Sequence, residues 1–231
     1  MKIAIISDIH SNLEAFEAVL NNIKSKEIDK IICLGDIVGY GSSPNECIEL
    51  IKKNGIQSIQ GNHDLNAVTL EKLEWFNENA REALKWTNKV LTEENKKFLK
   101  ELPETLEVKD QKNRLLAVHG SPKDHLYEYL EPTTDEDKIK DMIEDQKADV
   151  IACGHTHMPD VKKFELKLFL NPGSVGQPRN NNSKAQYAIL DLSNINFVTL
   201  EQVEYDIDTA AKKIIQAGLP RFLADRLYVG R

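Results

Sequence analysis

Several side chains that could bind metal ions stand directly after short apolar runs of this chain. They are Asp8 and His10, Asp36, Asn62 with His63 and Asp64, His119, and the pair His155 and His157. Imidazole, carboxylate and amide oxygen together suit borderline divalent metals such as manganese, iron, nickel or zinc. No thiolate belongs to the set, which disfavours a structural zinc site. These residue types therefore predict a metal centre with a catalytic function.

The number of these groups favours two ions over one. The candidate ligands are Asp8, His10, Asp36, Asn62, His119, His155 and His157. They are too many for one four-coordinate ion, but two ions that share a bridging carboxylate would use them. Two metals about 3.5–4 Å apart can hold a hydroxide and clamp both the attacking and the leaving oxygen of a phosphoryl displacement. The set predicts a dinuclear-metal phosphoesterase that works by attack of a metal-bound hydroxide.

The distribution of the histidines supports a shared site. Of the six histidines, five stand just after apolar runs and beside a glycine or another candidate ligand. Structural histidines would be scattered over helices and the surface instead. The sixth, His125, has no such surroundings, and we expect it at the surface.

The elements that must position these groups begin with a strand–helix–strand pattern. The sequence predicts strands at 3–6, 31–34 and 56–60, with helices at 13–26 and 44–53. This order predicts right-handed crossovers and a layered α/β fold. The carboxyl ends of such strands are where open α/β sheets bind ligands. Asp8 and His10 are two positions apart, so in an extended segment both would point to the same side.

The remainder of the chain predicts a helical insertion followed by further strands. Residues 65–102 predict two or three helices outside the sheet, with Trp75 and Trp86 as packing residues. Further strands are expected at 105–108, 115–118, 149–153, 161–164, 167–170, 186–190 and 197–203, and helices at 135–146 and 206–216. We expect one domain over residues 1–231, with its most mobile loop at 180–183.

Charge and composition exclude some partners. The chain has 30 basic and 37 acidic residues and a net charge of −7, which disfavours extended nucleic-acid binding and attachment to anionic membranes. No apolar run approaches about 18 residues, so we expect a cytoplasmic protein without a membrane span. Cys33, Cys47 and Cys153 are odd in number and widely spaced, which argues against a disulfide framework.

Five motifs together resemble the calcineurin-like metallophosphoesterase superfamily. They are Asp8-Ile9-His10, Gly35-Asp36, Gly61-Asn62-His63-Asp64, His119-Gly120 and Gly154-His155-Thr156-His157, and they occur in the family's order. The resemblance spans residues 3 to about 179. It implies a four-layer α-β-β-α sandwich of two mixed sheets that carries the helical insertion.

The resemblance also implies a role for each site residue. Asp8, His10 and His157 would hold the first metal, and Asn62, His119 and His155 would hold the second, with Asp36 as the bridge. His63 would stabilise the phosphoryl transition state and protonate the leaving oxygen, and Asp64 would orient it. The cofactors would be two divalent ions, with manganese as the first expectation and iron, nickel, zinc or magnesium as alternatives.

Substrate contacts are less defined by the sequence. The chain has Tyr40 and Leu65 where the protein serine/threonine phosphatases carry arginines or an acid, so those contacts do not carry over. Arg179 is a candidate for a phosphate contact, Tyr40 for stacking on a base or for shaping the cleft, and Asn12 for touching the substrate. An exposed arginine and a packing tyrosine are the alternatives.

The predicted substrate is a small phosphate ester. The Gly39-Tyr40-Gly41 loop and residues 171–179 look like the small bacterial and archaeal branch of the superfamily. A phosphodiester, a nucleotide or a phosphomonoester would fit, and a dinucleoside polyphosphate or a phosphoprotein is the alternative within enzymes. A catalytically silent interaction scaffold is the alternative outside enzymes. Relatives also suggest a homodimer.

Overall fold

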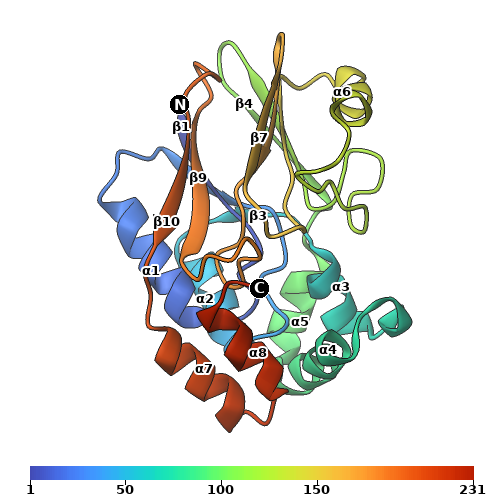
Figure 1. Ribbon diagram of the computed structural model, residues 1–231, viewed down its shortest axis with the longest axis vertical. Helices are drawn as coiled ribbons and strands as arrows, with labels where there is room; N and C mark the ends of the chain where they lie inside the picture. Colours follow the sequence, from blue (N-terminus) through green and yellow to red (C-terminus); the bar gives the residue numbers. More distant parts are fainter.

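Two five-stranded β-sheets form the centre of the computed structural model, which describes residues 1–231 (Figure 1). The first sheet has the order β10-β9-β1-β2-β3, with strands Val198–Val203, Ala185–Asp191, Lys2–Ile6, Lys30–Cys33 and Gln57–Ser58. The second has the order β4-β5-β6-β8-β7, with strands Thr105–Lys109, Arg114–Val118, Val150–Ala152, Lys167–Asn171 and Asp160–Phe164. Both sheets combine parallel and antiparallel pairs. The prediction of two mixed sheets is confirmed.

Strand β1 shows how the sheets and helices form four layers. Ile3 and Ile5 point toward the second sheet, into a core shared by both sheets, whereas Ala4 and Ile6 point toward the helices on the other face. All four side chains have no exposed surface. A strand that alternates between two buried faces must be apolar throughout, which explains its continuous apolar run. Each such isoleucine contributes about 1.5–3 kcal/mol of burial free energy.

Helices form the two outer layers. Helices α1 (Leu13–Lys24) and α2 (Pro44–Lys53) cover the first sheet, and α6 (Glu136–Glu144) covers the second. Figure 1 shows α1 and α6 on opposite sides of the strands. Asn12 caps α1, since its side-chain oxygen accepts a hydrogen bond from the amide of Ala15 at 3.2 Å.

The remaining helices gather beyond the carboxyl ends of the parallel strands. They are α3 (Asn62–Thr69), the 3-10 turn η1 (Leu73–Trp75), α4 (Glu78–Val90), α5 (Glu93–Lys100), α7 (Ile207–Gln216), α8 (Arg221–Asp225) and the 3-10 turn η2 (Arg226–Tyr228). Helices α4, α7 and α8 share one small apolar core with Tyr40. No helix in the protein is long and apolar enough to cross a lipid bilayer.

Three details differ from the sequence expectations. Strand β3 is only Gln57–Ser58, because the amide of Gln60 already bonds to the carbonyl of Pro103 instead of continuing the ladder. Trp75 is 61% exposed, so the prediction that both tryptophans are packing residues is wrong for Trp75. Trp86 does pack, against the core of α4, α7 and α8. Helix α8 and turn η2 lie beyond the last predicted helix.

Candidate dinuclear metal centre

The candidate ligands converge from both sheets. They follow the carboxyl ends of the parallel strands β1, β2, β5 and β6, and Asn62 is the first residue of α3. Their ligand atoms form two buried groups, each of three residues within 4.8 Å of one another. The first group is Asp8, His10 and His157, and the second is Asp36, His119 and His155.

The backbone at these residues is unusual. Asp8, His10, Asp36, His155 and His157 all have positive φ angles, between 49° and 68°. This left-handed region costs energy for residues with a Cβ atom, and such strain gathers at functional sites. Asp8 and His10 therefore do converge, but the expectation of an extended segment is wrong. The left-handed turns, rather than strand alternation, bring these side chains together.

In the first group, the tautomer of each imidazole is set by the backbone. Nδ1 of His10 lies 3.0 Å from the carbonyl of Val38, and Nδ1 of His157 lies 2.6 Å from the carbonyl of Gln177. Each Nδ1 must carry the proton to donate these bonds, so each Nε2 presents a lone pair. The two Nε2 atoms lie 3.0 Å apart, and Asp8 Oδ1 lies 3.2 Å from that of His157.

The second group has the same design. Nδ1 of His119 donates to the carbonyl of Leu34 at 2.8 Å, which leaves its Nε2 to face the centre. Burial opposes a charge on this ring, but Asp36 raises the pKa of His119 to about 9, so without a metal Nε2 carries a proton that a bound cation would replace. That Nε2 lies 3.1 Å from Nδ1 of His155 and 3.1 Å from Oδ1 of Asn62. Two ring nitrogens and an amide oxygen thus point at one place. Asn62, which the sequence singled out, stands beside this group.

Asp36 lies between the two groups. Its Oδ2 atom is 3.6 Å from Nε2 of His10 and 3.3 Å from Nε2 of His119. Its Oδ1 atom accepts a hydrogen bond from the amide of His63 at 2.8 Å, which holds the carboxylate in place. A carboxylate in this position can bind one ion in each group.

The donor set fits two divalent cations. Asp8 Oδ1 and Asp36 Oδ2 are buried and have no hydrogen-bond partner within the protein. Burial opposes ionisation, but His157 lowers the pKa of Asp8 and His119 lowers that of Asp36, so both carboxylates are negative at neutral pH. Buried lone pairs and unpaired carboxylate oxygens that face one another are unfavourable without a positive charge between them. Two candidate metal-binding groups joined by Asp36 fit a dinuclear centre.

His63 stands beside the first group without belonging to it. Its ring centroid lies 4.9 Å from that of His10, 4.5 Å from Tyr40 and 5.0 Å from Phe76. Its Nδ1 atom is buried and has no hydrogen-bond partner. Burial lowers the pKa of His63 to about 4, so the ring is neutral at neutral pH. The position suits a group that donates a hydrogen bond to a substrate at the centre.

Asp64 does not make the contact expected of it. Its Oδ1 accepts from the amide of Val38 and its Oδ2 from the amide of Gly61, both at 3.0 Å. Adjacent residues of a helix point in different directions, so Asp64 in α3 cannot orient the ring of its neighbour His63. Asp64 instead holds the Asp36–Tyr40 loop to the start of α3.

The three expected substrate contacts are placed differently. Arg179 is partly exposed, and its Nη2 lies 3.4 Å from the hydroxyl of Tyr40. Tyr40 itself is only 6% exposed, so its ring shapes the site and does not offer a free face for stacking. Asn12 is used structurally, because its Nδ2 donates to the carbonyl of Gly176 at 2.9 Å while its oxygen caps α1. His125 lies at the surface, 3.3 Å from Glu104.

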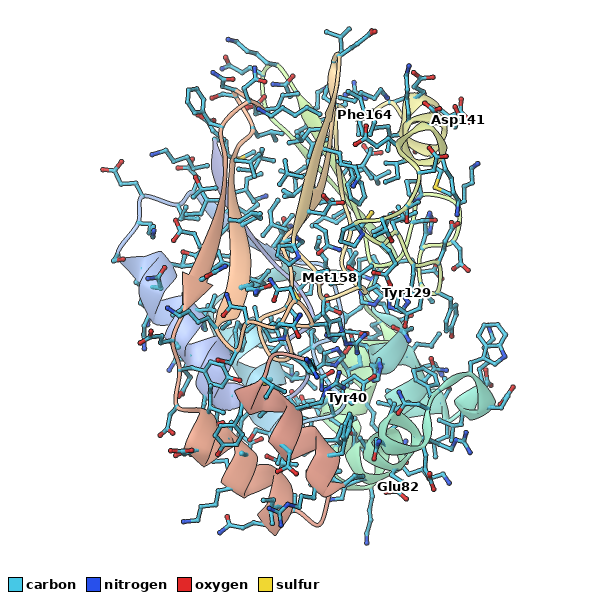
Figure 2. The ribbon with its side chains drawn as sticks, viewed as in Figure 1. Tyr40, Glu82, Tyr129, Asp141, Met158 and Phe164 are labelled. Carbon is cyan, nitrogen blue, oxygen red and sulfur yellow. The ribbon has the colours of Figure 1, made fainter.

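Sequence reasoning missed two residues near the centre. Tyr129 is 49% exposed and stacks on His155, with ring centroids 3.8 Å apart. Arg226 brings its guanidinium to 5.8 Å from the centre of the Tyr40 ring. Neither belongs to a motif, and their distance in sequence from the ligands gave no signal. Figure 2 shows Tyr40 beside α8, the helix that precedes Arg226.

Comparisons with known proteins agree with this arrangement. The chain is 44% identical to the uncharacterized protein MJ0912 of Methanocaldococcus jannaschii, over 99% of this chain and 98% of the relative. It is 26% identical to the phosphodiesterase YfcE of Escherichia coli K12, over 87% of this chain and 92% of YfcE. The crystal structure of a metallophosphoesterase from Sphaerobacter thermophilus is similar, with a TM-score of 0.82, 35% identity and coverage of 100% of this chain and 99% of that one.

The family assignment rests on the sequence as well as on the fold. The calcineurin-like phosphoesterase superfamily domain matches residues 1–195, which include all the candidate ligands. The fold, the two ligand groups and the full-length relatives agree with this match. The chain therefore belongs to the calcineurin-like phosphoesterase superfamily.

Proposed function

We propose that the protein is a metal-dependent phosphoesterase that hydrolyses a small phosphodiester. The observation that carries the proposal is the pair of ligand groups joined by Asp36, whose Oδ2 lies within 3.6 Å of Nε2 of His10 and 3.3 Å of Nε2 of His119. The family supports phosphoester hydrolysis, and the relative YfcE is named a phosphodiesterase. A nucleotide or a phosphomonoester remains a candidate substrate.

Each residue of the centre would have one task. Asp8, His10 and His157 would hold the first ion, Asn62, His119 and His155 the second, and Asp36 both. When bound, the two ions would supply an activated water and neutralise charge on the phosphoryl oxygens. Manganese is our first choice, because oxygen and imidazole ligands accept it and the site contains no thiolate.

His63 would assist the departure of the leaving group. Its ring lies against His10 and is fixed between Tyr40 and Phe76, so it needs no reorientation to reach a substrate at the centre. A neutral ring can donate an N–H hydrogen bond to the leaving oxygen as negative charge develops there. A proton donor of this kind contributes about 10²–10⁴-fold to the rate.

Tyr129, an exposed aromatic side chain on the second group, supports an ester with an organic substituent. Tyr129 stacks on His155, and Trp75 meets Tyr127 edge to face with ring centroids 5.1 Å apart. The ammonium of Lys72 lies 4.6 Å from the Trp75 ring and 4.5 Å from that of Tyr127. Exposed rings that end near a catalytic centre can pack against the base or aryl group of a substrate.

The test is hydrolysis by metal-stripped protein with manganese, nickel, zinc or magnesium added back. The panel would contain a phosphate monoester, a phosphate diester and a dinucleoside polyphosphate. We expect metal-dependent turnover that is highest for the diester. Turnover highest for the monoester would replace the proposed substrate class. No turnover with any metal, despite two bound ions per chain, would favour an interaction scaffold instead.

Two variants locate the activity. Asp36→Ala should abolish turnover and His63→Ala should lower kcat about 10²–10⁴-fold while the metal content stays at two ions. The matched control is His125→Ala, because His125 lies at the surface beside Glu104. If Asp36→Ala or His63→Ala kept turnover within about threefold of the parent, the site assignment would be wrong.

A further inference from the structure

Two arginines beside the metal centre have no acidic partner. Arg179 lies in the loop after β8, and Arg226 lies at the start of η2. The guanidinium carbon of Arg179 is 5.9 Å from the centre of the Tyr40 ring, and that of Arg226 is 5.8 Å from it. Neither forms an ion pair with an aspartate or glutamate side chain, whereas Arg221 pairs with Asp225 at 3.4 Å. Like charges that share one aromatic ring repel each other unless an anion joins them.

Their hydrogen bonds leave donors free. Arg179 donates from Nη2 to the Tyr40 hydroxyl at 3.4 Å and to Gln177 Oε1 at 3.3 Å, and its buried Nε has no partner. Arg226 donates only from Nε, to the carbonyl of Arg231. Burial, with repulsion from Arg179, lowers the pKa of Arg226 to about 10, so it is still charged at neutral pH. Both side chains are partly exposed and thus accessible to a ligand.

The arginines lie one aromatic ring away from the metal centre. The Tyr40 ring centroid is 4.7 Å from that of the ligand His10 and 4.5 Å from that of His63. The amide of Arg179 also donates to the carbonyl of the ligand His157 at 3.2 Å. An anion held by the arginines would therefore be a near neighbour of a phosphoryl group at the metals.

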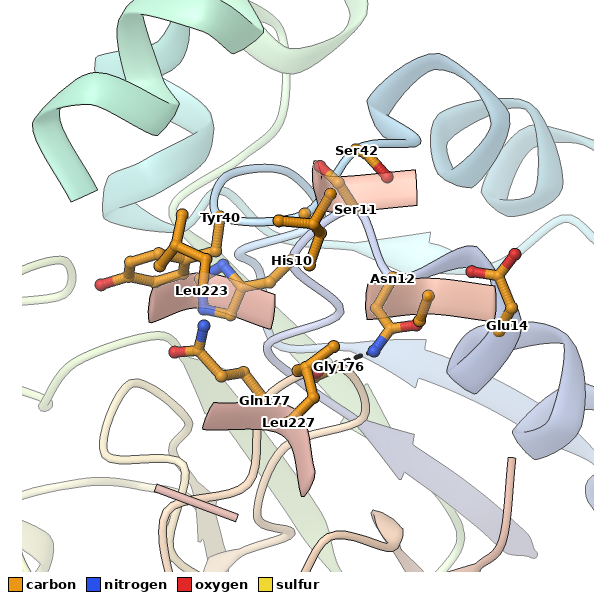
Figure 3. Close-up of a pocket in the computed structure, with 13 residues that line it drawn as sticks. His10, Ser11, Asn12, Glu14, Tyr40, Ser42, Gly176, Gln177, Leu223 and Leu227 are labelled. Atoms are coloured by element: carbon orange, nitrogen blue, oxygen red, sulfur yellow. Dashed lines mark hydrogen bonds between the residues drawn. The ribbon is translucent and has the colours of Figure 1, made fainter. Parts of the chain in front are cut away.

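Packing holds Arg226 in this position. Leu223 of α8 and Leu227 of η2 enclose, with His10 and Tyr40, a cavity of only about 10 Å³ (Figure 3). That volume holds at most one water molecule, so the C-terminal helices fit closely on the ligand loops. The segment after η2 is anchored as well.

The segment after η2 is anchored by the loop at residues 180–183, which the sequence predicts to be the most mobile. The amide of Asn181 donates to the carbonyl of Gly230 at 2.8 Å, and Arg231 Nε donates to Asn181 Oδ1 at 2.9 Å. Gly230 has a φ of +62°, and a Cβ there would lie 2.3 Å from the carbonyl oxygen of Asn182. The close approach requires glycine. The loop after Arg179 and the segment after Arg226 thus hold each other.

We propose that Arg179 and Arg226 form an anion subsite that binds a second phosphate group of the substrate. The inference rests on the proposed function and adds a second phosphate group to the phosphate ester that the protein hydrolyses. Among the nucleotide candidates, it favours a nucleoside diphosphate. Guanidinium forks match phosphate oxygens, and each arginine has N–H donors that no other group of the protein uses. Arg226 lies outside the matched family domain at residues 1–195, so this subsite depends on the C-terminal segment.

The test compares a ligand with one phosphate group to one with two. Binding of AMP and of α,β-methylene-ADP to the manganese-loaded protein would be measured by calorimetry for the parent, Arg226→Gln, Arg226→Ala and Arg221→Ala. Arg221 is the matched control, since it lies in the same C-terminal segment but is exposed and paired with Asp225. Circular dichroism and metal content would show that each variant folds and loads.

We expect the parent to bind α,β-methylene-ADP about tenfold more tightly than AMP, as one added charge-assisted contact provides. Both Arg226 variants should remove most of that preference, and Arg221→Ala should keep it. Equal binding of the two ligands by the parent, or a preference that survives both Arg226 variants, would overturn the subsite. Binding is measured separately from turnover. A negative binding result would therefore contradict the subsite without contradicting the proposed hydrolysis, and absence of hydrolysis would not by itself contradict the subsite.

Discussion

The Nε2 atoms of His10 and His157 lie 3.0 Å apart, and the opposite nitrogen of each ring bonds to a backbone carbonyl. Burial lowers the pKa of both rings, so each is neutral and its single proton stays on the nitrogen that donates to the carbonyl. Two lone pairs therefore face each other in a buried site. Only a positive charge between them makes the arrangement favourable. The first ligand group therefore fits a cation, and the effect of such a cation on the stability of the protein can be measured.

Metal loading should raise thermal stability. At a free metal concentration about a hundredfold above Kd, one site adds about 2.7 kcal/mol to the free energy of unfolding, which for a chain of this size raises Tm by about 5–10 °C. Calorimetry of the stripped and the manganese-loaded protein measures this shift. His10→Ala should lose the part of the shift that the first ion contributes, and His125→Ala should lose none. An unchanged Tm on loading the parent would argue against the centre.

The substitution Gly39→Ala should displace His63 without disturbing the metals. Gly39 has a φ of +96°, and a Cβ there would lie 2.5 Å from Nδ1 of His63. Moving that ring out of line should lower kcat at least about tenfold. Gly55→Ala is the matched control, because Gly55 also has a positive φ, +60°, but no atom lies within 4 Å of its added Cβ. Steady-state kinetics and metal analysis of both variants test this prediction. Equal kcat values for the two variants would show that Gly39 is not needed to make room for His63.

Tyr129 should support the second ligand group through its ring. It covers His155 at a centroid distance of 3.8 Å and an interplanar angle of 29°. Removing the ring in Tyr129→Ala frees His155 to rotate, and loss of such support around a metal ligand typically costs about 10–100-fold in affinity. Titration with manganese should show weaker binding of one ion only. Tyr129→Phe keeps the ring and should bind both ions like the parent. If Tyr129→Phe lost as much manganese affinity as Tyr129→Ala, the hydroxyl rather than the ring would support the site.

Acid should weaken the C-terminal helices through Asp206. Hydrogen bonds from the side chain and the amide of Thr209, at 2.7 and 2.9 Å, lower the pKa of the Asp206 carboxyl below its ordinary value of 3.8. Because folding lowers this pKa, the ionised carboxylate stabilises the folded state at pH values above the pKa of the unfolded chain. This stabilisation is lost as the pH falls through the pKa of the folded state.

The variants of Asp206 separate capping from charge. Asp206→Asn can still accept the hydrogen bond from Thr209 at the start of α7 but cannot titrate, so its Tm should fall less than that of the parent between about pH 5 and pH 3. Asp206→Ala loses the cap and should have a lower Tm at every pH. Thermal melts across that range test both. Parallel curves for the parent and Asp206→Asn would show that Asp206 contributes nothing to the acid sensitivity.

Much of the site could be predicted from the sequence because its residues are tied to strand ends. An apolar run followed by Asp36 or His119 predicts where the strand stops and where its polar side chain lies, since parallel strands end at one edge. The parallel strands, the candidate ligands at their ends and the helix at Pro44–Lys53 followed from such local patterns, whereas the arrangement in two sheets followed from the resemblance to the family. The left-handed backbone at Asp8 and His10 did not, because it is imposed by bonds such as that from the amide of Asp8 to the carbonyl of Gly35.

Contacts between distant segments were decided by the tertiary structure alone. The sequence by itself determined the chemistry of the centre, because the ligand types and their order are local facts. The surroundings of that centre come from packing. Asp64 bonds to backbone amides, Tyr129 reaches His155, and Arg226 reaches Tyr40 only because α8 and η2 fold back over the ligand loops. The role of a side chain outside a motif depends on its neighbours in the folded protein. A local sequence pattern does not predict those neighbours, because they come from distant segments.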